Sequence, residues 1–251
     1  MSTHPKTGIL LLNMGGPDTP DDVGPFLYNL FSDPDIIKLP LSFIFQKPLA
    51  WMIVNSRLKE AKANYAKMPQ WNGGSPQLPM TKKQAQSLKA NLFAQLDENI
   101  PVYIAMRYWF PFTDNALEEI KKDGIEHLIV VTLYPHFSYT TTGSSLNELK
   151  RRLKAHRMDS LKLSIVGGYC KDADYINALA QTMRDPLHNS EWTCHPNDVH
   201  ILFSAHSLPV KHVERTKDPY PKLIEQLQKT MMYSVPQWVD TLKKRRTVIW
   251  N

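Results

Sequence analysis

The sequence predicts an α/β protein built on parallel sheets, because buried-strand patterns alternate with amphipathic helical patterns along the chain. Continuous apolar runs indicate strands that are covered on both faces, as parallel sheets require. Helical patterns separate these runs, for example the i, i+3, i+4 spacing of Val23, Phe26 and Leu27. The strand-like runs are Gly8–Asn13, Val102–Met106, Leu128–Leu133, Leu163–Val166 and Ile201–Phe203.

The bulk composition is that of a globular protein, with 251 residues, 42% of them hydrophobic and 22% charged. Cys170 and Cys194 have no C-x-x-C spacing, so neither a disulfide framework nor a zinc knuckle is indicated. The first eight residues have no apolar core and do not form a secretory signal. A change of structural unit near residues 158–170 is weakly marked.

The net charge of +6 is concentrated in two basic runs, residues 150–154 and 243–246. Solvated helix faces are the usual explanation for such runs. No nucleic-acid-binding motif accompanies them, so we expect no nucleic-acid partner. A basic surface would suit an anionic small ligand or an acidic membrane surface.

The first predicted strand is followed by Met14-Gly15-Gly16-Pro17, whose glycines allow a sharp turn or a close approach to a ligand. This spacing is neither a dinucleotide-binding fingerprint nor a P-loop. A helix should follow, with Thr19 as its cap and Pro20 at its first position. Gly24-Pro25 would then move the start of this helix or kink it.

Residues 36–54 form the most apolar stretch of the chain. Lys38, Lys47 and two prolines argue against a membrane span, which needs about 20 nearly uncharged residues. Core packing is the default interpretation, and an apolar lip around a flat ligand or a peripheral membrane contact are alternatives. A helical, polar segment is predicted from Ser56 to Lys67.

Thr81-x-x-Gln84 has the pattern of a capping box that opens a helix with Ala85, Leu88, Leu92 and Leu96 facing inward. The next predicted strand ends in Arg107-Tyr108-Trp109, and an arginine there can meet an anion or a flat ring, or close a structural salt bridge. A helix from Thr113 to Asp123 should stop at Gly124.

The run from Tyr134 to Ser145 is rich in hydroxyl groups and comes directly before a predicted helix. Free backbone N–H groups and the helix dipole would make this an anion site, although helix capping explains one or two of these residues. A strand at Leu163–Val166, a Gly167-Gly168 turn and a helix near Tyr175 follow.

The most informative stretch is Ser204-Ala205-His206-Ser207, which ends the apolar run Ile201–Phe203. Pro209 prevents the strand from continuing within a sheet. An imidazole is therefore predicted at the carboxyl end of a buried strand, where open α/β sheets bind their ligands. A structural histidine at a strand end is the alternative on this stretch alone.

An ordered set of motifs makes the chain resemble the ferrochelatase family as far as about Pro221. Their order and spacing together are more specific than any single motif. The motifs are Leu12-Asn13-Met14-Gly15-Gly16-Pro17, Gly73-Gly74-Ser75-Pro76, Met106-Arg107-Tyr108, Leu133-Tyr134-Pro135, Ser138, Thr141-Thr142-Gly143-Ser144, Leu202-Phe203-Ser204-Ala205-His206-Ser207-Leu208-Pro209 and Asp218-Pro219-Tyr220-Pro221.

The resemblance implies two chelatase-like, Rossmann-like αβα domains, residues 1–165 and 166–251, with the second incomplete. It implies insertion of ferrous iron into protoporphyrin IX to make protohaem, with iron as a substrate and no cofactor held. His206 would be the catalytic base or metal ligand. The location would be cytoplasmic, with residues 36–54 as a lip that contacts membrane in some members. The substrate-binding residues would be Met14, Ser75, Arg107, Tyr108, Tyr134, Ser138, Thr142 and Ser204.

These roles agree with general chemistry, since metallation removes two pyrrole protons and a neutral imidazole is a suitable base near neutral pH. The family's later Ser-Asp-His-x-x-Glu-Thr-Leu-type motif is not found, and Asp240-Thr241-Leu242 is read as coincidence. Thr247–Trp250 looks like the start of the family's next strand, so a truncated chain is expected. A non-catalytic porphyrin-binding remnant and a chelatase for another tetrapyrrole or metal, such as cobalt, are the alternatives.

Overall fold

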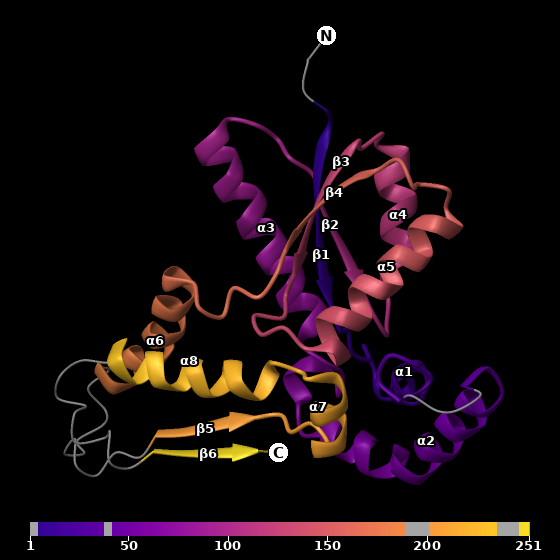
Figure 1. The fold of residues 1–251 in the computed structure, drawn as a ribbon, viewed down its shortest axis with the longest axis vertical. Coiled ribbons are helices and arrows are strands. Elements are labelled where there is room, and N and C mark those ends of the chain that lie inside the picture. Colours follow the sequence, from indigo (N-terminus) through magenta and orange to yellow (C-terminus); the bar gives the residue numbers. More distant parts are fainter. Residues whose placement is uncertain (1–4, 38–41, 189–200, 235–245, 251) are drawn as a thin grey trace. The chain divides into compact units, whose positions relative to one another are not determined.

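The computed structural model describes residues 5–37, 42–188, 201–234 and 246–250. The chain forms two compact units, which are described separately below (Figure 1). Unit 1 comprises residues 1–134 and 139–167, and unit 2 comprises residues 135–138 and 168–251. The predicted boundary at residue 165 lies close to the division at 167/168, whereas no pattern in the sequence indicates that residues 135–138 belong with the second unit.

Unit 1 is built on a parallel sheet with the strand order β2-β1-β3-β4, which confirms the predicted α/β class. β1 (Thr7–Asn13) is central, and it pairs in parallel with β2 (Val102–Met106) and with β3 (His127–Thr132). β4 (Lys162–Val166) forms an edge beside β3. All four strands therefore have their carboxyl ends at the same edge of the sheet.

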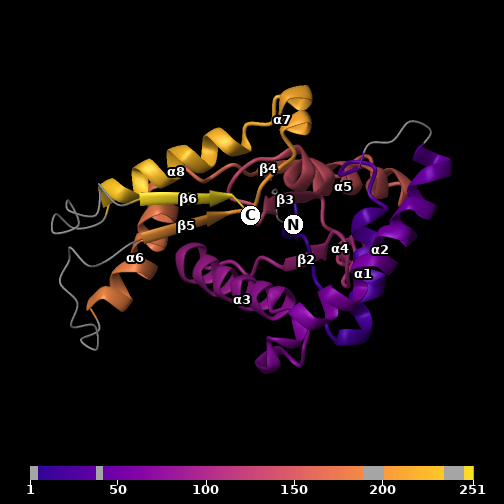
Figure 2. The ribbon, with the colours of Figure 1, turned by 90° about the horizontal axis from the view of Figure 1, so that it is seen from below.

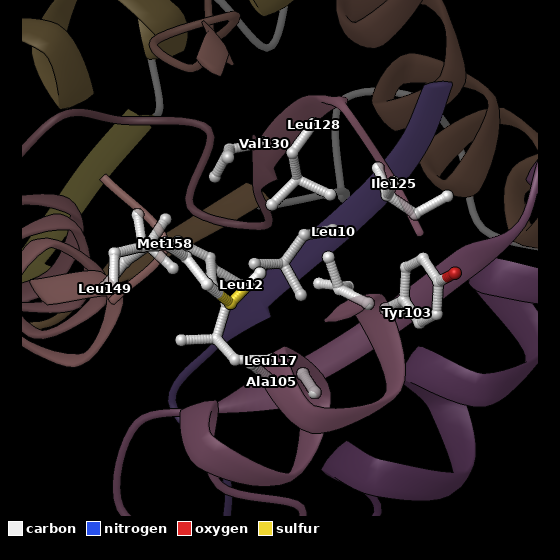
Figure 3. Close-up of a cluster of buried hydrophobic side chains, with 13 residues drawn as sticks. Leu10, Leu12, Tyr103, Ala105, Leu117, Ile125, Leu128, Val130, Leu149 and Met158 are labelled. Atoms are coloured by element: carbon white, nitrogen blue, oxygen red, sulfur yellow. The ribbon is translucent and has the colours of Figure 1, made fainter. Parts of the chain in front are cut away.

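Alternate residues of β1 supply the core on the two faces of this sheet. Leu10 and Leu12 pack with α4 (Thr113–Lys122) and α5 (Ser144–Ala155) in the cluster drawn in Figure 3. Ile9 and Leu11 lie on the opposite face, against α3 (Gln77–Leu96). Figure 2 shows the strands between α3 on one side and α5 on the other, so unit 1 has three αβα layers.

The first helical segment begins in two steps, and both predicted starts are found. Thr19 caps a short 3-10 helix, η1 (Pro20–Asp22), and α1 (Val23–Phe31) continues directly from it. Pro25 falls in the first turn of α1, where its missing N–H is not needed for the helix ladder. α1 therefore begins one residue before Gly24, close to the start that Gly24-Pro25 indicated.

The apolar stretch at 36–54 and the polar segment after it form one helix, α2 (Ser42–Ala66), with Pro48 inside it. The predicted helical segment from Ser56 to Lys67 is confirmed up to Ala66, and the helix begins earlier than predicted because it passes through Pro48 at the cost of one ladder bond. Ala50 and Val54 are buried on one side. Ile44, Phe45, Trp51 and Met52 are 52–65% exposed, so core packing explains only part of this segment.

No helix in the described part of the chain has both the length and the apolar character that crossing a bilayer requires.

α3 begins four residues before the predicted capping box. Thr81 lies inside the helix, and its buried hydroxyl accepts a hydrogen bond from the Asn13 amide at 3.0 Å. At the start of the helix, the N–H of Gln77 instead donates a hydrogen bond to the Ser75 hydroxyl at 3.2 Å. Leu96, predicted to face inward, is 54% exposed at the end of α3. A short 3-10 helix, η2 (Pro69–Trp71), precedes this region.

α4 ends as predicted, with Asp123 at its C-cap and Gly124 at a φ of +65°. The hydroxyl-rich run forms a π-helical turn, η3 (Tyr139–Gly143), that leads into α5. The basic run of α5 is an ion-paired helix face, as expected, since Arg151 binds Asp35 and Glu148. Residues 243–245 of the second basic run lie outside the described residues.

Unit 2 contains α6 (Ala173–His188), β5 (Ile201–Ala205), α7 (Val210–Thr216), α8 (Tyr220–Ser234) and β6 (Arg246–Trp250). β5 and β6 are parallel, and β6 coincides with the strand expected at Thr247–Trp250. Leu202 is 58% exposed, which contradicts a strand buried on both faces, because β5 has a single strand neighbour in the described part of the chain. Cys170 is buried, and Cys194 lies outside the described residues.

Candidate functional site

In unit 1, the predicted site residues lie at or beside the carboxyl edge of the sheet. Met14 follows β1, Arg107 and Tyr108 follow β2, and Tyr134 lies two residues beyond β3. The segments after β1 and β2 stay paired beyond the sheet, because the Tyr108 N–H donates to the Met14 carbonyl at 2.9 Å. The parallel register therefore holds Met14, Arg107 and Tyr108 together.

The two glycine motifs pack against each other beside this edge. The Ser75 N–H donates to the Pro17 carbonyl at 2.7 Å, so the loop before α3 is tied to the loop after β1. A Cβ on Gly16 would lie 2.4 Å from the Ser75 hydroxyl oxygen. Glycine is required at position 16 by this close approach, and the turn interpretation of the motif is sufficient to explain it.

Arg107 and Tyr108 converge on a carboxylate that sequence reasoning missed, that of Asp33. The Arg107 guanidinium lies 2.9 Å from this carboxylate, the Tyr108 hydroxyl donates to it at 2.6 Å, and the Ser144 hydroxyl donates to it at 2.5 Å. The Asp33 side chain has no exposed surface, and that of Arg107 is 12% exposed. Burial of the Tyr108 hydroxyl, followed by the nearby Asp33 charge, raises the Tyr108 pKa and keeps this hydroxyl protonated.

These contacts distinguish the two interpretations of Arg107, a ligand contact or a structural salt bridge. Arg107 closes a buried structural salt bridge, and it also donates from Nε to the Ser144 hydroxyl at 2.8 Å. Its guanidinium lies 4.8 Å from the centre of the Tyr108 ring. The start of α5 does meet an anion through Ser144, and that anion is the protein's own Asp33.

A surface hollow of about 370 Å³ opens beside Arg107. Its lining carries two arginines and two carboxylates, so it differs from the apolar slot that a flat macrocycle needs. The lining residues are Asn29, Ser32, Asp33, Pro34, Arg107, Phe112, Glu148 and Arg151.

Tyr134 and Thr142 lie on the segments that flank residues 135–138. The Tyr134 and Ser145 hydroxyl oxygens are 3.2 Å apart, and burial raises the Tyr134 pKa. Thr142 is 2% exposed, and within the described part of the chain its hydroxyl oxygen has no hydrogen-bond partner. Buried hydroxyls are normally satisfied, so Thr142 retains the capacity for a further polar contact.

Unit 2 holds the remaining predicted residues, Ser138, Ser204 and His206. Ser204 lies in β5, and His206 is exposed directly after that strand. The β5–β6 ladder ends at the pair Ala205–Trp250, so His206 is the first residue beyond it. Ser138 is buried and donates to the Asp218 carboxylate at 2.8 Å.

A family model for ferrochelatase matches residues 6–250 of this chain. The chain belongs to the ferrochelatase family. It is 46% identical over 223 residues to ferrochelatase-2, chloroplastic, of Cucumis sativus, covering 88% of this chain and 42% of that protein. It is 40% identical over 231 residues to the ferrochelatase of Nostoc punctiforme, covering 92% of this chain and 58% of that protein.

A third ferrochelatase, that of Prochlorococcus marinus (strain MIT 9215), is 39% identical over 254 residues and matches 98% of this chain. The match covers 63% of that relative, so the chain spans roughly half the length of the curated relatives cited here. The family match extends across both units, and it confirms the resemblance read from the ordered motifs.

Ferrochelatases act on a metal, and in the described residues of this member no three His, Cys, Asp or Glu side chains gather into a metal-binding group. The polar groups nearest to the predicted site residues are instead internal anchors, Asp33 in unit 1 and Asp218 in unit 2. Asp218 stood in a family motif but had no role in the sequence argument. Asp33 carried no sequence signal, because its partners lie 75 and 111 residues away in the chain.

Proposed function

We propose that this chain carries out the ferrochelatase reaction, the insertion of ferrous iron into protoporphyrin IX to give protohaem. The observation that carries the proposal is the family match over residues 6–250, which includes the strand-end His206. His206 is exposed just beyond a parallel strand, which is where α/β proteins present groups to their ligands.

The reaction requires acid–base chemistry and no electron transfer. Two pyrrole N–H bonds break, two Fe–N bonds form besides the two donor bonds from the other nitrogens, and iron stays ferrous throughout. The two protons leave to a base and then to solvent. An imidazole is suited to accept such a proton or to hand over a ferrous ion, since iron(II) binds nitrogen ligands readily.

The proposed roles of the other residues follow from their surroundings. Arg107 and the buried Tyr108 are fixed by Asp33, so they would give the surface that meets the ring a rigid support in place of a mobile cation. Met14, Ser75, Tyr134, Ser138, Thr142 and Ser204 are proposed as further contacts of the porphyrin. Thr142 would supply a hydrogen bond that its buried hydroxyl lacks among the described residues.

The test is anaerobic metallation of protoporphyrin IX by the purified chain, followed by the absorbance of the metalloporphyrin. We expect turnover in the wild type, a loss of about 10²-fold or more in His206→Ala, and normal turnover in the control His156→Ala. His156 pairs with Asp114 and is not among the predicted site residues. A wild type that binds porphyrin, seen as quenched tryptophan fluorescence, without metallating it would support the non-catalytic alternative instead. Turnover with cobalt but not with iron would support the other alternative.

We also propose that α2 makes a peripheral membrane contact. Ile44, Phe45, Trp51 and Met52 lie within three turns of one helix and are 52–65% exposed. Co-sedimentation with vesicles containing anionic lipid should fall when Trp51 and Phe45 are both changed to Ser. Equal sedimentation of the variant and the wild type would remove this proposal.

A further inference from the structure

Trp109 is a partly exposed aromatic residue at the carboxyl edge of the unit 1 sheet, just beyond the end of β2. The residue before it is held by its backbone on two sides. The Tyr108 N–H donates to the Met14 carbonyl at 2.9 Å, and the Tyr108 carbonyl accepts the Asn29 side-chain amide at 3.0 Å. Trp109 is therefore held beside the loop that follows β1.

The first glycine of that loop leaves room for Trp109. Gly15 has a φ of +85°, a conformation that side chains rarely adopt. A Cβ at this position would also lie 3.1 Å from the backbone nitrogen of Trp109 and 3.2 Å from its Cβ. The base of the tryptophan side chain thus packs directly on the backbone of Gly15.

A second contact fixes the far end of the indole. The Nε1–H group of Trp109 donates to the Asp18 carboxylate at 3.1 Å. A tryptophan side chain has two torsions, so contacts at Cβ and at Nε1 leave the indole little freedom. Because Trp109 is only partly buried, some of this fixed aromatic surface can contact a ligand.

The rest of the loop carries further exposed aromatic surface. Phe110 is 54% exposed and Phe112 is 38% exposed. The Pro111 carbonyl between them accepts the Met106 N–H at 2.7 Å, so the loop is closed on the last residue of β2. Apolar surface gathered on one fixed loop marks an interaction site more often than scattered exposed residues do. The carboxyl edge of a parallel sheet is also where ligands bind.

We propose that Trp109 is a porphyrin-binding residue whose indole packs against the flat ring of protoporphyrin IX. This inference rests on the proposed function, because it takes the porphyrin as the ligand at this edge. Sites for flat apolar ligands are lined by aromatic side chains, and a side chain fixed in advance loses little freedom on binding. Such a contact is made to substrate and transition state alike, so Trp109 contributes to affinity, whereas His206 contributes to rate.

The direct test is ¹⁹F NMR of the chain labelled with 5-fluorotryptophan and titrated with metal-free protoporphyrin IX. The Trp109 signal is identified by its loss in Trp109→Phe. The Trp71 signal, identified in the same way with Trp71→Phe, is the internal control, since Trp71 is another partly exposed tryptophan of unit 1 and lies in η2.

We expect the Trp109 signal to move upfield on porphyrin binding, because the ring current of a porphyrin shifts nuclei that lie over its face. The Trp71 signal should stay in place. A Trp109 signal that does not move at saturating porphyrin would overturn the proposal.

Affinity gives a second test, in which Trp109→Leu removes the aromatic surface. It should raise both Kd and KM for the porphyrin about tenfold and change kcat less than about twofold. Trp109→Phe keeps an aromatic ring and should bind within about threefold of the wild type. The matched control Trp71→Leu should leave Kd unchanged. A wild-type Kd in Trp109→Leu, or a fall in kcat as large as the rise in KM, would remove the binding role.

These results can be told apart from the outcome for the proposed reaction. The NMR shift is read in the wild-type chain, so it does not depend on the folding of Trp109→Leu. A shift without turnover would keep Trp109 as a binding residue and overturn the reaction. Turnover without the shift would keep the reaction and remove the role of Trp109, and a chain that binds no porphyrin would overturn both.

Discussion

Asp33 shows at the scale of a single residue how the strand-end side chains of unit 1 are kept in place. Arg107, Tyr108 and Ser144 all bind its carboxylate, and none of these partners is close to it in sequence. A buried charge with this many partners is strongly destabilising when one partner is removed, because the remaining charge has no compensation.

Asp33→Ala should therefore lower the free energy of unfolding by about 3–5 kcal/mol, since it leaves the Arg107 guanidinium buried and unpaired. Asp35→Ala is the control two residues away, because Asp35 pairs with Arg151, whose side chain is 46% exposed. That exposed pair is worth about 1 kcal/mol or less. Urea unfolding of both variants makes the comparison, and equal losses would show that Asp33 is not the anchor of unit 1.

His136 gives a second prediction at this scale. Burial lowers its pKa below the ordinary 6.5, and within the described residues its Nε2 atom has no hydrogen-bond partner. As the pH falls through 6.5, the unfolded chain binds a proton before the folded chain does, so protonation favours unfolding. The stability that neutral His136 contributes is thus present above pH 6.5 and is lost at lower pH.

The thermal midpoint of the wild type should accordingly fall between pH 7 and pH 5 by more than that of His136→Gln, which cannot titrate. If the thermal midpoints of the two proteins fell by the same amount between pH 7 and pH 5, His136 would not be the group responsible.

At single positions, the sequence indicated which side chains take part in polar contacts but not which groups they contact. Arg107 was recognised as either a ligand contact or a structural cation, and only the three-dimensional position of Asp33 distinguishes these. Ser144 was part of a suspected anion site, and the anion is internal. Partners that are remote in sequence leave no local pattern, so they cannot be found from spacing alone.

At the scale of the elements, the glycine after β1 shows how close contact between loops determines residue choice. A Cβ at position 16 would lie 2.4 Å from the Ser75 hydroxyl oxygen and 2.5 Å from its Cβ. The loop before α3 is fixed by its own backbone bond to Pro17, so it cannot easily move away.

Gly16→Ala should cost about 1–3 kcal/mol of stability through this overlap. Gly24→Ala in α1 is the matched control, because a Cβ there would meet Leu58 at an ordinary 3.5 Å. It should stabilise the helix by up to about 1 kcal/mol. Chemical denaturation of the two variants should give opposite signs, and a harmless Gly16→Ala would mean that the two loops are not tightly apposed.

Element prediction succeeded where period and composition agreed and failed where tertiary contacts set the boundary. The four strands of unit 1 and the stop of α4 at Gly124 were found because apolar runs and a glycine C′ are local signals. α3 starts at Gln77, whose N–H donates to the Ser75 hydroxyl. Thr81 does not cap the helix, because its hydroxyl accepts a hydrogen bond from Asn13. α2 continues through Pro48, so a proline inside a helical pattern did not end the helix here.

At the scale of the whole molecule, the chain passes between its two units three times, at residues 134/135, 138/139 and 167/168. The short passage 135–138 is held in unit 2 by two remote bonds. The Cys170 N–H donates to the Pro135 carbonyl at 3.0 Å, and Ser138 donates to Asp218. A single predicted boundary could not describe a unit that is formed by two separate segments, residues 135–138 and 168–251.

The family was recognisable from sequence because its motifs occur in order, and the match over residues 6–250 shows it directly. The activity of this chain is a separate claim, since it spans roughly half the length of its relatives. His206, which is exposed directly after β5, carries that claim.

The most direct measurement is single-turnover metallation of protoporphyrin IX already bound to the chain, started with ferrous iron under anaerobic conditions. We expect the absorbance of bound porphyrin to convert to that of protohaem in the wild type and to stay that of metal-free porphyrin in His206→Ala. Bound porphyrin that remains metal-free in the wild type, or converts equally fast in both proteins, would contradict this expectation.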